Sequence, residues 1–305
     1  MSVSVFIDGA VGTTGLEIRD RLSSRDDVTL ISLDDTRRKD SAARREALNE
    51  ADIAILCLPD AAAIEAVGLI DNSRTRVIDA SSAHRVAEGW TYGFAELEHA
   101  VADSPRVSNP GCYPTGFLAL VAPLVRAGLI PADWPLTVNA VSGYSGGGKA
   151  LIERFDDDPD LAFRDYGFTL AHKHVPEMQR HAGLTHAPVF APTVTRAFRG
   201  MIVEVPLSLS AIPGRPTGAA LRDALGAAFA GCPLVRVHSE QPDELLMARH
   251  ADANDRLDLY VCVDAADTQA RLVATLDNLG KGAGGAAVQN LNLMAGLDPL
   301  AGLVL

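Results

Sequence analysis

The stretch Val3-Ser-Val-Phe-Ile-Asp8-Gly9-Ala-Val-Gly12-Thr13-Thr14-Gly15 decides the fold. Its first six residues predict a short apolar strand, and three glycines lead from it into a segment of helical spacing, residues 16–22. A strand, a glycine turn and a helix in this order are typical of a dinucleotide-binding domain, where backbone N–H groups at a helix N-terminus hold the pyrophosphate. The spacing is G-x-x-G-x-x-G rather than G-x-G-x-x-G, so an ordinary glycine-rich turn is the alternative.

Strands and helices continue to alternate beyond this loop. We expect strands at residues 28–33, 53–58 and 76–79, and helices at residues 40–49 and 61–70. The unbroken apolar run at 53–58, IAILCL, is typical of a strand buried in a parallel sheet. This alternation predicts an α/β fold with a Rossmann-like, doubly wound parallel sheet.

The pattern changes after about residue 112, where strands become longer and crossovers fewer. Residues 188–195 and 199–209 are expected to form antiparallel strands. The other expected elements are strands at 136–142, 234–238 and 257–263, and helices at 113–127, 218–229, 268–280 and 285–297. We therefore predict a second, α+β domain with a mixed or antiparallel sheet.

Composition and charge exclude several classes of protein. The chain has 305 residues and a net charge of −12, which argues against a nucleic-acid partner because such a partner requires a basic face. No apolar run is long enough to span a bilayer, and the first residues lack the pattern of an export signal. The cysteines have no metal or disulfide spacing, which favours a cytoplasmic protein with free thiols at positions 57, 112, 232 and 262.

Charged residues after the second expected strand bear on the choice of cofactor. An acidic residue at this place binds a ribose 2′-OH, whereas arginine accepts a 2′-phosphate. The sequence Asp34-Asp35-Thr36-Arg37-Arg38-Lys39 offers both. Its three cations favour NADP, and a solvated run of charges is the alternative.

The segment Gly143-Tyr-Ser-Gly-Gly-Gly-Lys149-Ala150 nearly matches a phosphate-binding P-loop. Ala150 stands where that motif needs a hydroxyl to hold Mg²⁺, which argues against nucleotide hydrolysis. We expect this loop to shape a substrate pocket instead, with Ser142 and Ser145 as hydrogen-bond donors.

Cys112 is the strongest candidate for a nucleophile. It follows the turn sequence Asn109-Pro-Gly and precedes a long apolar segment of helical spacing. A helix N-terminus at this point favours the thiolate and offers N–H groups to an oxyanion. The other cysteines are expected to be core or loop residues.

Histidines of the segment His172-Lys-His174-Val-Pro-Glu177 are candidates for the acid or base that assists the thiol. The residues alone leave open which histidine acts. A metal pair is an alternative, although no third ligand is evident. Surface or structural positions are expected for the histidines at 99, 181, 186, 238 and 250.

With these motifs in hand, the chain resembles the N-acetyl-gamma-glutamyl-phosphate reductases of the shorter type, within the semialdehyde dehydrogenase superfamily. The resemblance runs through most of the chain. It rests on GAVGTTG (9–15), DASSAHR (79–85), YGFAEL (92–97), SNPGCYPTG (108–116), VSGYSGGGK (141–149), HKHVPEM (172–178) and LDNLGKGAGGAAVQNLNLM (276–294).

The resemblance implies NADPH-dependent reductive dephosphorylation of N-acetyl-glutamyl 5-phosphate, a step of arginine biosynthesis, through a cysteine thioester and without a metal. It implies that the C-terminal helix returns to the first domain. We therefore expect a dinucleotide-binding domain at residues 1–112 and 281–305, a catalytic and dimerisation domain at residues 113–280, and a homodimer or homotetramer.

The resemblance also implies roles for individual residues. Cys112 matches the nucleophile, His172 is preferred over His174 as acid/base, and Asn109 is a candidate for the oxyanion. The expected substrate-binding residues are Arg85, Ser142, Lys149, Tyr166, His174 and Glu177. The expected cofactor-binding residues are Gly9, Gly12, Thr13, Thr14, Gly15, Arg37, Arg38, Ser81 and Asn290.

Two alternatives remain. Aspartate-semialdehyde dehydrogenases share this architecture and a similar cysteine turn, but they are expected to lack the H-x-H-x-P-E segment. A non-catalytic NADP-binding sensor would keep the fold without needing Cys112.

Overall fold

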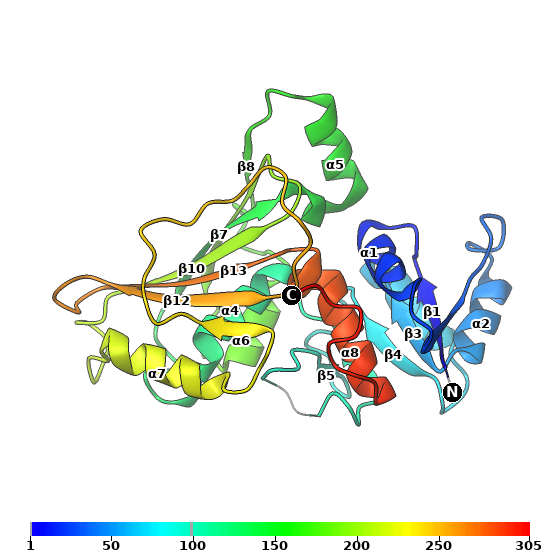
Figure 1. Ribbon diagram of the computed structural model, residues 1–305, viewed down its shortest axis with the longest axis horizontal. Helices are drawn as coiled ribbons and strands as arrows, with labels where there is room; N and C mark the ends of the chain where they lie inside the picture. The colour runs from blue at the N-terminus through cyan, green and yellow to red at the C-terminus, as the bar shows by residue number, and fades with distance from the viewer. Residues whose placement is uncertain (1, 98–99) are drawn as a thin grey trace. The chain divides into compact units, whose positions relative to one another are not determined.

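A computed structural model describes residues 2–97 and 100–305 and divides them into two compact units (Figure 1). The first unit contains the residues up to Gly111 together with Ala283–Val304. The second contains Cys112–Gly282 and Leu305. His99 lies outside the described residues.

The first unit is built on a six-stranded sheet with the order β2-β1-β3-β4-β6-β5, in which every neighbouring pair is parallel. The predicted doubly wound parallel sheet is therefore confirmed. The strands are β1 (Val3–Asp8), β2 (Val28–Ile31), β3 (Ile53–Leu56), β4 (Arg76–Asp79), β5 (Thr91–Tyr92) and β6 (Arg106–Ser108).

Helices cover both faces of this sheet because alternate strand residues point to opposite sides. Val5 and Ile7 pack in one apolar layer with α1 (Thr13–Leu22) and α8 (Gly285–Ala295). Phe6 packs in the other layer with α2 (Ser41–Glu50) and α3 (Asp60–Leu69). The C-terminal helix thus belongs to the layers of the first unit, next to α1.

The second unit holds a seven-stranded mixed sheet with the order β11-β12-β13-β10-β7-β9-β8. Its pairs are parallel at β11–β12 and β7–β9 and antiparallel elsewhere, which confirms the predicted mixed sheet. The strands are β7 (Thr137–Gly143), β8 (Phe163–Asp165), β9 (Val189–Thr195), β10 (Met201–Leu207), β11 (Val235–Val237), β12 (Leu257–Val263) and β13 (Ala270–Leu276).

Helix α4 (Cys112–Arg126) is the centre of the second unit. Every side chain from Tyr113 to Leu124 is buried. The helix packs against β10, β13, α6 (Val175–Ala182) and α7 (Gly218–Ala228), as Figure 1 shows. The position of its first residue is therefore set by the whole core of the unit.

One predicted element is wrong. Residues 268–280 were expected to form a helix, but they contain β13 and the start of a short π-helix (Gly280–Gly284). β13 pairs with β10 on one side and β12 on the other, and Leu272 and Ala274 are fully buried. Pairing on both sides overrides the helical tendency of this segment.

Two other segments differ in detail from expectation. β9 and β10 do run in opposite directions, but they are not neighbours because β7 lies between them. The expected loop after β7 forms a 3-10 turn (Tyr144–Gly147) that leads directly into α5 (Gly148–Asp157).

The ion pair between Asp8 and Arg44 predicts that Arg44 contributes more to stability than the adjacent Arg45. The guanidinium of Arg44 donates twice to Asp8, from Nε at 3.1 Å and Nη2 at 2.9 Å, and Asp8 is only 4% exposed. Replacing Arg44 with alanine leaves this carboxylate buried and unpaired, so we expect a loss of about 3 kcal/mol in the free energy of unfolding.

Arg45 is the matched control, because both side chains of its ion pair with Asp71 are 56% exposed. Arg45→Ala is expected to cost at most about 1 kcal/mol in urea unfolding. Equal losses for the two variants would contradict a structural role of the Asp8–Arg44 pair.

Candidate active site

A cavity of about 830 Å³ lies in the first unit at the carboxyl ends of β1, β2 and β3. Its lining includes Gly9–Gly12, the turn between β1 and α1. Gly9 has a φ of +90°, and a Cβ built there would lie 2.3 Å from the carbonyl oxygen of Cys57. Only glycine allows this close approach. Thr13, Thr14 and Gly15 form the first turn of α1, so N–H groups gather here as expected for anion binding.

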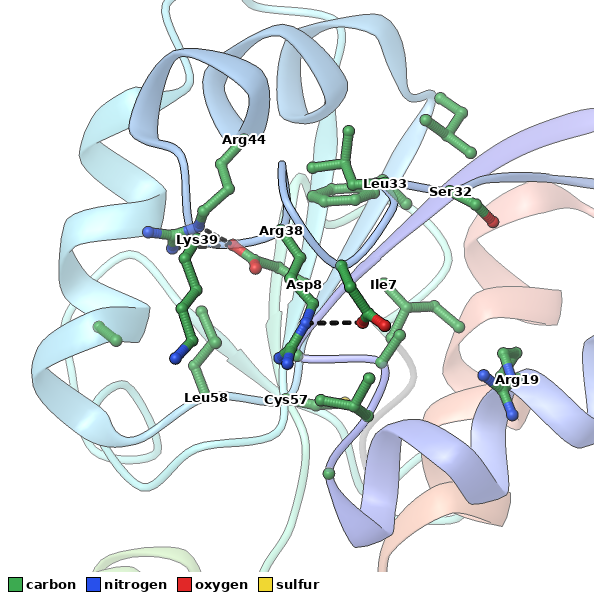
Figure 2. A pocket seen from close by; sticks show the side chains of 18 of the residues that line it. Ile7, Asp8, Arg19, Ser32, Leu33, Arg38, Lys39, Arg44, Cys57 and Leu58 are labelled. Carbon is green, nitrogen blue, oxygen red and sulfur yellow. Dashed lines mark hydrogen bonds and ion pairs between the residues drawn. The ribbon is translucent and has the colours of Figure 1, made fainter.

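Four cations line this cavity. Figure 2 shows Lys39 and Arg44 on one side and Arg19 on the other, with Arg38 between them. Nε of Arg38 pairs with Asp35 at 3.0 Å. Arg37 is not among the lining residues, and its Nη2 donates to Glu46 at 3.0 Å. The structure therefore brings Arg38 and Lys39, but not Arg37, to the cavity.

Asp34 also lines the cavity, but its carboxylate stabilises the turn after β2. The hydroxyl of Thr36 donates to it at 2.6 Å, and the N–H groups of Thr36 and Arg37 each donate at 2.9 Å. These hydrogen bonds lower the pKa of Asp34, and the one from the Thr36 hydroxyl has the largest effect. One carboxylate oxygen of Asp34 accepts all three hydrogen bonds, so this oxygen is occupied within the turn.

The segment 79–85 wraps around the buried carboxylate of Asp79. Ser81 donates to it through its backbone N–H at 2.9 Å and its hydroxyl at 2.7 Å, and Nδ1 of His84 lies 2.6 Å from it. Arg85 is 8% exposed and donates to the backbone carbonyls of Asn109 and Ala80. From the sequence we expect Arg85 to bind the substrate. At least two N–H groups of Arg85 instead donate to nearby backbone carbonyls.

Asn109 and Asn290 meet inside the first unit. Nδ2 of Asn290 donates to Oδ1 of Asn109 and to the carbonyl of Gly93, both at 3.0 Å. Nδ2 of Asn109 donates to the carbonyl of Ala283 at 3.0 Å. Within residues 2–97 and 100–305, Oδ1 of Asn290 is buried and accepts no hydrogen bond. A buried amide oxygen of this kind suits a ligand N–H.

Cys112 is the first residue of α4 and is partly exposed. Gly282 closes tightly on it, because a Cβ built at this glycine would lie 2.8 Å from Cβ of Cys112. The expected helix N-terminus at the cysteine is confirmed. Sequence reasoning missed Gly282 and its neighbour Lys281, which is 2% exposed; the glycine-rich run at 280–285 was their only signal.

Aromatic and imidazole rings cluster beside the start of α4. Tyr113 contacts His172 and His174, with ring centroids 6.2 and 5.8 Å apart. Nε2 of His172 lies 3.5 Å from the Tyr166 hydroxyl, which lies 3.4 Å from that of Tyr113. Burial raises the pKa of both tyrosines. Tyr113, the residue that follows Cys112 on α4, brings this cluster to the start of the helix.

The remaining expected substrate-binding residues fall in the same unit. Glu177 is 1% exposed, with Oε1 3.9 Å from Nε2 of His174. Ser142 is buried and donates to the carbonyl of Gly143. Lys149 is exposed on the first turn of α5. Tyr113, which the sequence analysis did not single out, is the residue that links this cluster to the cysteine.

None of the helices in the described part of the chain is long and apolar enough to cross a membrane. No group of three histidine, cysteine, aspartate or glutamate side chains in residues 2–97 and 100–305 is arranged to hold a metal ion.

The first unit has a Rossmann-like parallel sheet, and the second has a mixed sheet with a cysteine at the start of its central helix. This combination is that of a semialdehyde dehydrogenase. Family models agree: the semialdehyde dehydrogenase NAD binding domain matches residues 4–104, and the dimerisation domain matches residues 112–278.

Within that class, comparison with curated relatives identifies the family. The chain is 51% identical to an N-acetyl-gamma-glutamyl-phosphate reductase from Mesorhizobium japonicum, over 97% of this chain and all of the relative. It is 50% identical to one from Burkholderia ambifaria, over 96% of each chain. The chain belongs to the N-acetyl-gamma-glutamyl-phosphate reductase family.

Solved structures share the fold at low identity. An aspartate semialdehyde dehydrogenase II from Vibrio cholerae, complexed with ASA, matches with a TM-score of 0.70 and 16% identity over 97% of this chain and 98% of that one. An aspartate semialdehyde dehydrogenase with NADP from Candida albicans matches with a TM-score of 0.64 and 13% identity, over 97% and 99%.

The environments of Cys57 and Cys112 predict different reactivity. Burial, with the carboxylates of Asp79 and Asp8, raises the pKa of Cys57 to about 12. At pH 8 the Cys57 thiolate is therefore scarce, whereas the start of α4 favours the thiolate of Cys112. We expect iodoacetamide at pH 8 to modify Cys112 first and to leave Cys57 intact, as measured by peptide mass spectrometry. Modification of Cys57 as fast as Cys112 in the folded protein would contradict this, and unfolding in urea should expose both.

Proposed function

We propose that the protein reduces N-acetyl-glutamyl 5-phosphate to N-acetyl-glutamate 5-semialdehyde with NADPH, releasing phosphate, in arginine biosynthesis. The observation that carries this is identity near 50% to reductases of that name over almost the full length of both chains. Cys112 at the start of the buried helix α4 supplies the nucleophile that the reaction needs.

Each domain has its own task in this proposal. Residues 1–112 and 281–305 bind the dinucleotide, and residues 113–280 carry the catalytic residues and the dimer contacts. The match of residues 112–278 to a dimerisation domain supports a homodimer or homotetramer. The free thiols and the biosynthetic role support a cytoplasmic location.

The reaction begins with the sulfur of Cys112. Its thiolate attacks the acyl carbon, the C–O bond to phosphate breaks, and phosphate leaves with the bonding electrons, so that a thioester remains. N–H groups at the start of α4 stabilise the negative oxygen that develops on the carbonyl. Asn109 is the second candidate for this role, although its carboxamide already binds Ala283 and Asn290.

The second half of the reaction returns the cysteine. When bound, the reduced nicotinamide supplies the hydride for the thioester. His172 assists departure of the sulfur from the hemithioacetal, since it belongs to the ring cluster that contains Tyr113. His174, Glu177, Tyr166, Ser142 and Lys149 remain candidates for holding the N-acetyl-glutamyl group, and Arg85 for its phosphate.

Residues of the first unit fit NADPH. Gly9, Gly12 and the first turn of α1 with Thr13, Thr14 and Gly15 would hold the pyrophosphate. Oδ1 of Asn290 suits the carboxamide N–H of nicotinamide, because this oxygen is buried without a donor among the described residues. Ser81, fixed on Asp79, belongs to the same set of proposed cofactor contacts.

Substrate choice tests the proposed function. In the reverse direction, with NADP⁺ and inorganic phosphate, we expect oxidation of N-acetyl-glutamate 5-semialdehyde to exceed that of aspartate semialdehyde at least about 100-fold in kcat/KM. The reason is that a site shaped for the acetamido group loses those contacts with the smaller aldehyde. Absorbance of NADPH measures both rates.

Cys112→Ser serves as the inactive control and should lower turnover at least about 1000-fold while the protein still binds NADPH. Cys262→Ser, at a partly exposed cysteine on β12, should keep normal turnover. Equal rates with the two aldehydes would reject the proposed substrate, and an active Cys112→Ser variant would reject the nucleophile.

The cavity also predicts which cations recognise the 2′-phosphate of NADPH. Replacing Arg38 and Lys39 with alanine removes two charged donors from its lining, so we expect the Kd for NADPH to rise about 100-fold and that for NADH to change little. Arg37→Ala is the control, because Arg37 does not line the cavity. Fluorescence titration measures both constants. An equal loss for NADPH and NADH, or a larger effect of Arg37, would contradict the assignment.

A further inference from the structure

The turn that follows β13 closes on the cysteine. A Cβ built at Gly282 would lie 2.8 Å from Cβ of Cys112 and 3.3 Å from its Cα. Carbon atoms in ordinary contact lie about 3.5–4.0 Å apart, so position 282 has no room for a side chain. Gly282 does not have a positive φ, so its backbone conformation alone would accept alanine. The main chain at Gly282 therefore lies directly against Cys112.

Asp277 holds this turn from its start. The N–H of Gly282 donates to the carbonyl oxygen of Asp277 at 2.9 Å, which is the i to i−5 hydrogen bond of the π-helix. The carboxylate of Asp277 also acts on the turn, because its Oδ1 accepts the N–H of Leu279 at 2.9 Å. The backbone and the side chain of Asp277 thus both fix the path of the chain to Gly282.

Two other segments of the second unit meet the same carboxylate, which is only 5% exposed. Oδ2 of Asp277 accepts Nη1 of Arg199 at 2.9 Å and the N–H of Asn254 at 3.2 Å. Gly280 lies against the carbonyl oxygen of Asn254, which a Cβ built at this glycine would overlap. Because a buried ion pair often adds little net stability, the carboxylate is better explained by the N–H groups that it orders.

Asn278 links the turn to the loop after β7. The N–H of Gly200 can only donate, so Oδ1 of Asn278 accepts it, at 2.9 Å, and Nδ2 of Asn278 donates to the Ser145 hydroxyl at 2.9 Å. Asn278 and Ser145 are each 1% exposed. The turn therefore contacts the expected nucleophile at one end and, at the other, a serine expected to shape the substrate pocket.

We propose that the turn after β13 positions Cys112, with Asp277 as its anchor and Gly282 as the surface against which the cysteine is set. Both are positioning residues, because they act through Cys112 rather than on the substrate. This inference rests on the proposed function, since attack of a thiolate on an acyl carbon requires accurate alignment. A displacement of about 1 Å can cost about 100-fold in rate.

Gly282→Ala tests the surface. The added methyl group must displace Cys112, so we expect kcat for N-acetyl-glutamate 5-semialdehyde to fall at least about 100-fold. Gly218→Ala is the matched control, because a Cβ there would lie 2.5 Å from Cγ1 of Val263, which pairs with Ala270 at the opposite end of β13. It should lose stability in urea but keep kcat within about twofold. An equal fall in both variants, or no fall in Gly282→Ala, would overturn the proposal.

Asp277→Asn tests the anchor and decides the matter if Gly282→Ala does not fold. It keeps the size of the side chain, but one amide oxygen replaces two carboxylate oxygens, so we expect kcat to fall about tenfold with KM within about threefold. Asp264→Asn is the control, because Asp264 accepts the N–H groups of Thr268 and Gln269 in the exposed turn at the other end of β13. It should keep normal kcat. An unchanged kcat in Asp277→Asn would reject the anchor.

Alkylation of Cys112 separates its position from its ionisation. Iodoacetamide needs no alignment with a bound substrate, so we expect the rate at pH 8 in Asp277→Asn to stay within about threefold of the unaltered protein. A loss of alkylation that matches the loss of kcat would mean that the thiolate itself is lost, and this would overturn the positioning role.

A bulkier reagent tests the contact without the reaction. Gly282→Ala should slow modification of Cys112 by N-ethylmaleimide at least about tenfold, because the methyl group crowds the cysteine, whereas Gly218→Ala should not. Peptide mass spectrometry measures both rates, and equal rates would contradict the contact. If the unaltered protein oxidises neither semialdehyde, the proposed function fails, and these maleimide rates still decide whether the turn sets the cysteine.

Discussion

The burial of helix α4 is the constraint on which the catalytic unit depends. Twelve successive residues, Tyr113–Leu124, are buried, and they pack against the sheet and against helices α6 and α7. A helix covered in this way cannot shift along its axis without opening cavities in a close-packed core. The N–H groups of its first turn are consequently fixed in space, and Cys112 with them. Because moving the helix would disrupt the core at a large cost in free energy, the core holds Cys112 as accurately as a nucleophile requires.

A comparable constraint acts at the glycine turn of the first unit. Gly9 lies against the backbone of Cys57, and the preceding residue, Asp8, is held by Arg44 from α2. Close backbone contact on one side and a buried ion pair on the other leave the turn little freedom. Because the N–H donors of the turn are already ordered, binding of a phosphate does not lose conformational entropy by ordering them.

Sequence reasoning succeeded where one physical rule dominates a segment. The apolar strands Val3–Asp8 and Ile53–Leu56 and the helix start at Cys112 followed from hydrophobic pattern and turn chemistry. The segment 268–280 failed because β13 is held by strands from distant parts of the chain, which its local pattern does not reveal. For the same reason, the engagement of Arg37 with Glu46 and of Arg85 with backbone carbonyls could not be foreseen from residue type.

The chemistry of His172 shows how far residue type alone can go. A histidine near a cysteine suggests a base, and the pattern H-x-H-x-P-E supports no finer statement. The protonation state depends on the direction of hydrogen bonds, and direction is set by groups that can act in only one way. Here that group is the backbone N–H of His174, which donates to Nδ1 of His172 at 3.1 Å whatever its own side chain does. The position of the hydrogen on a neutral His172 ring is therefore set by the folded backbone, which the residue types alone do not reveal.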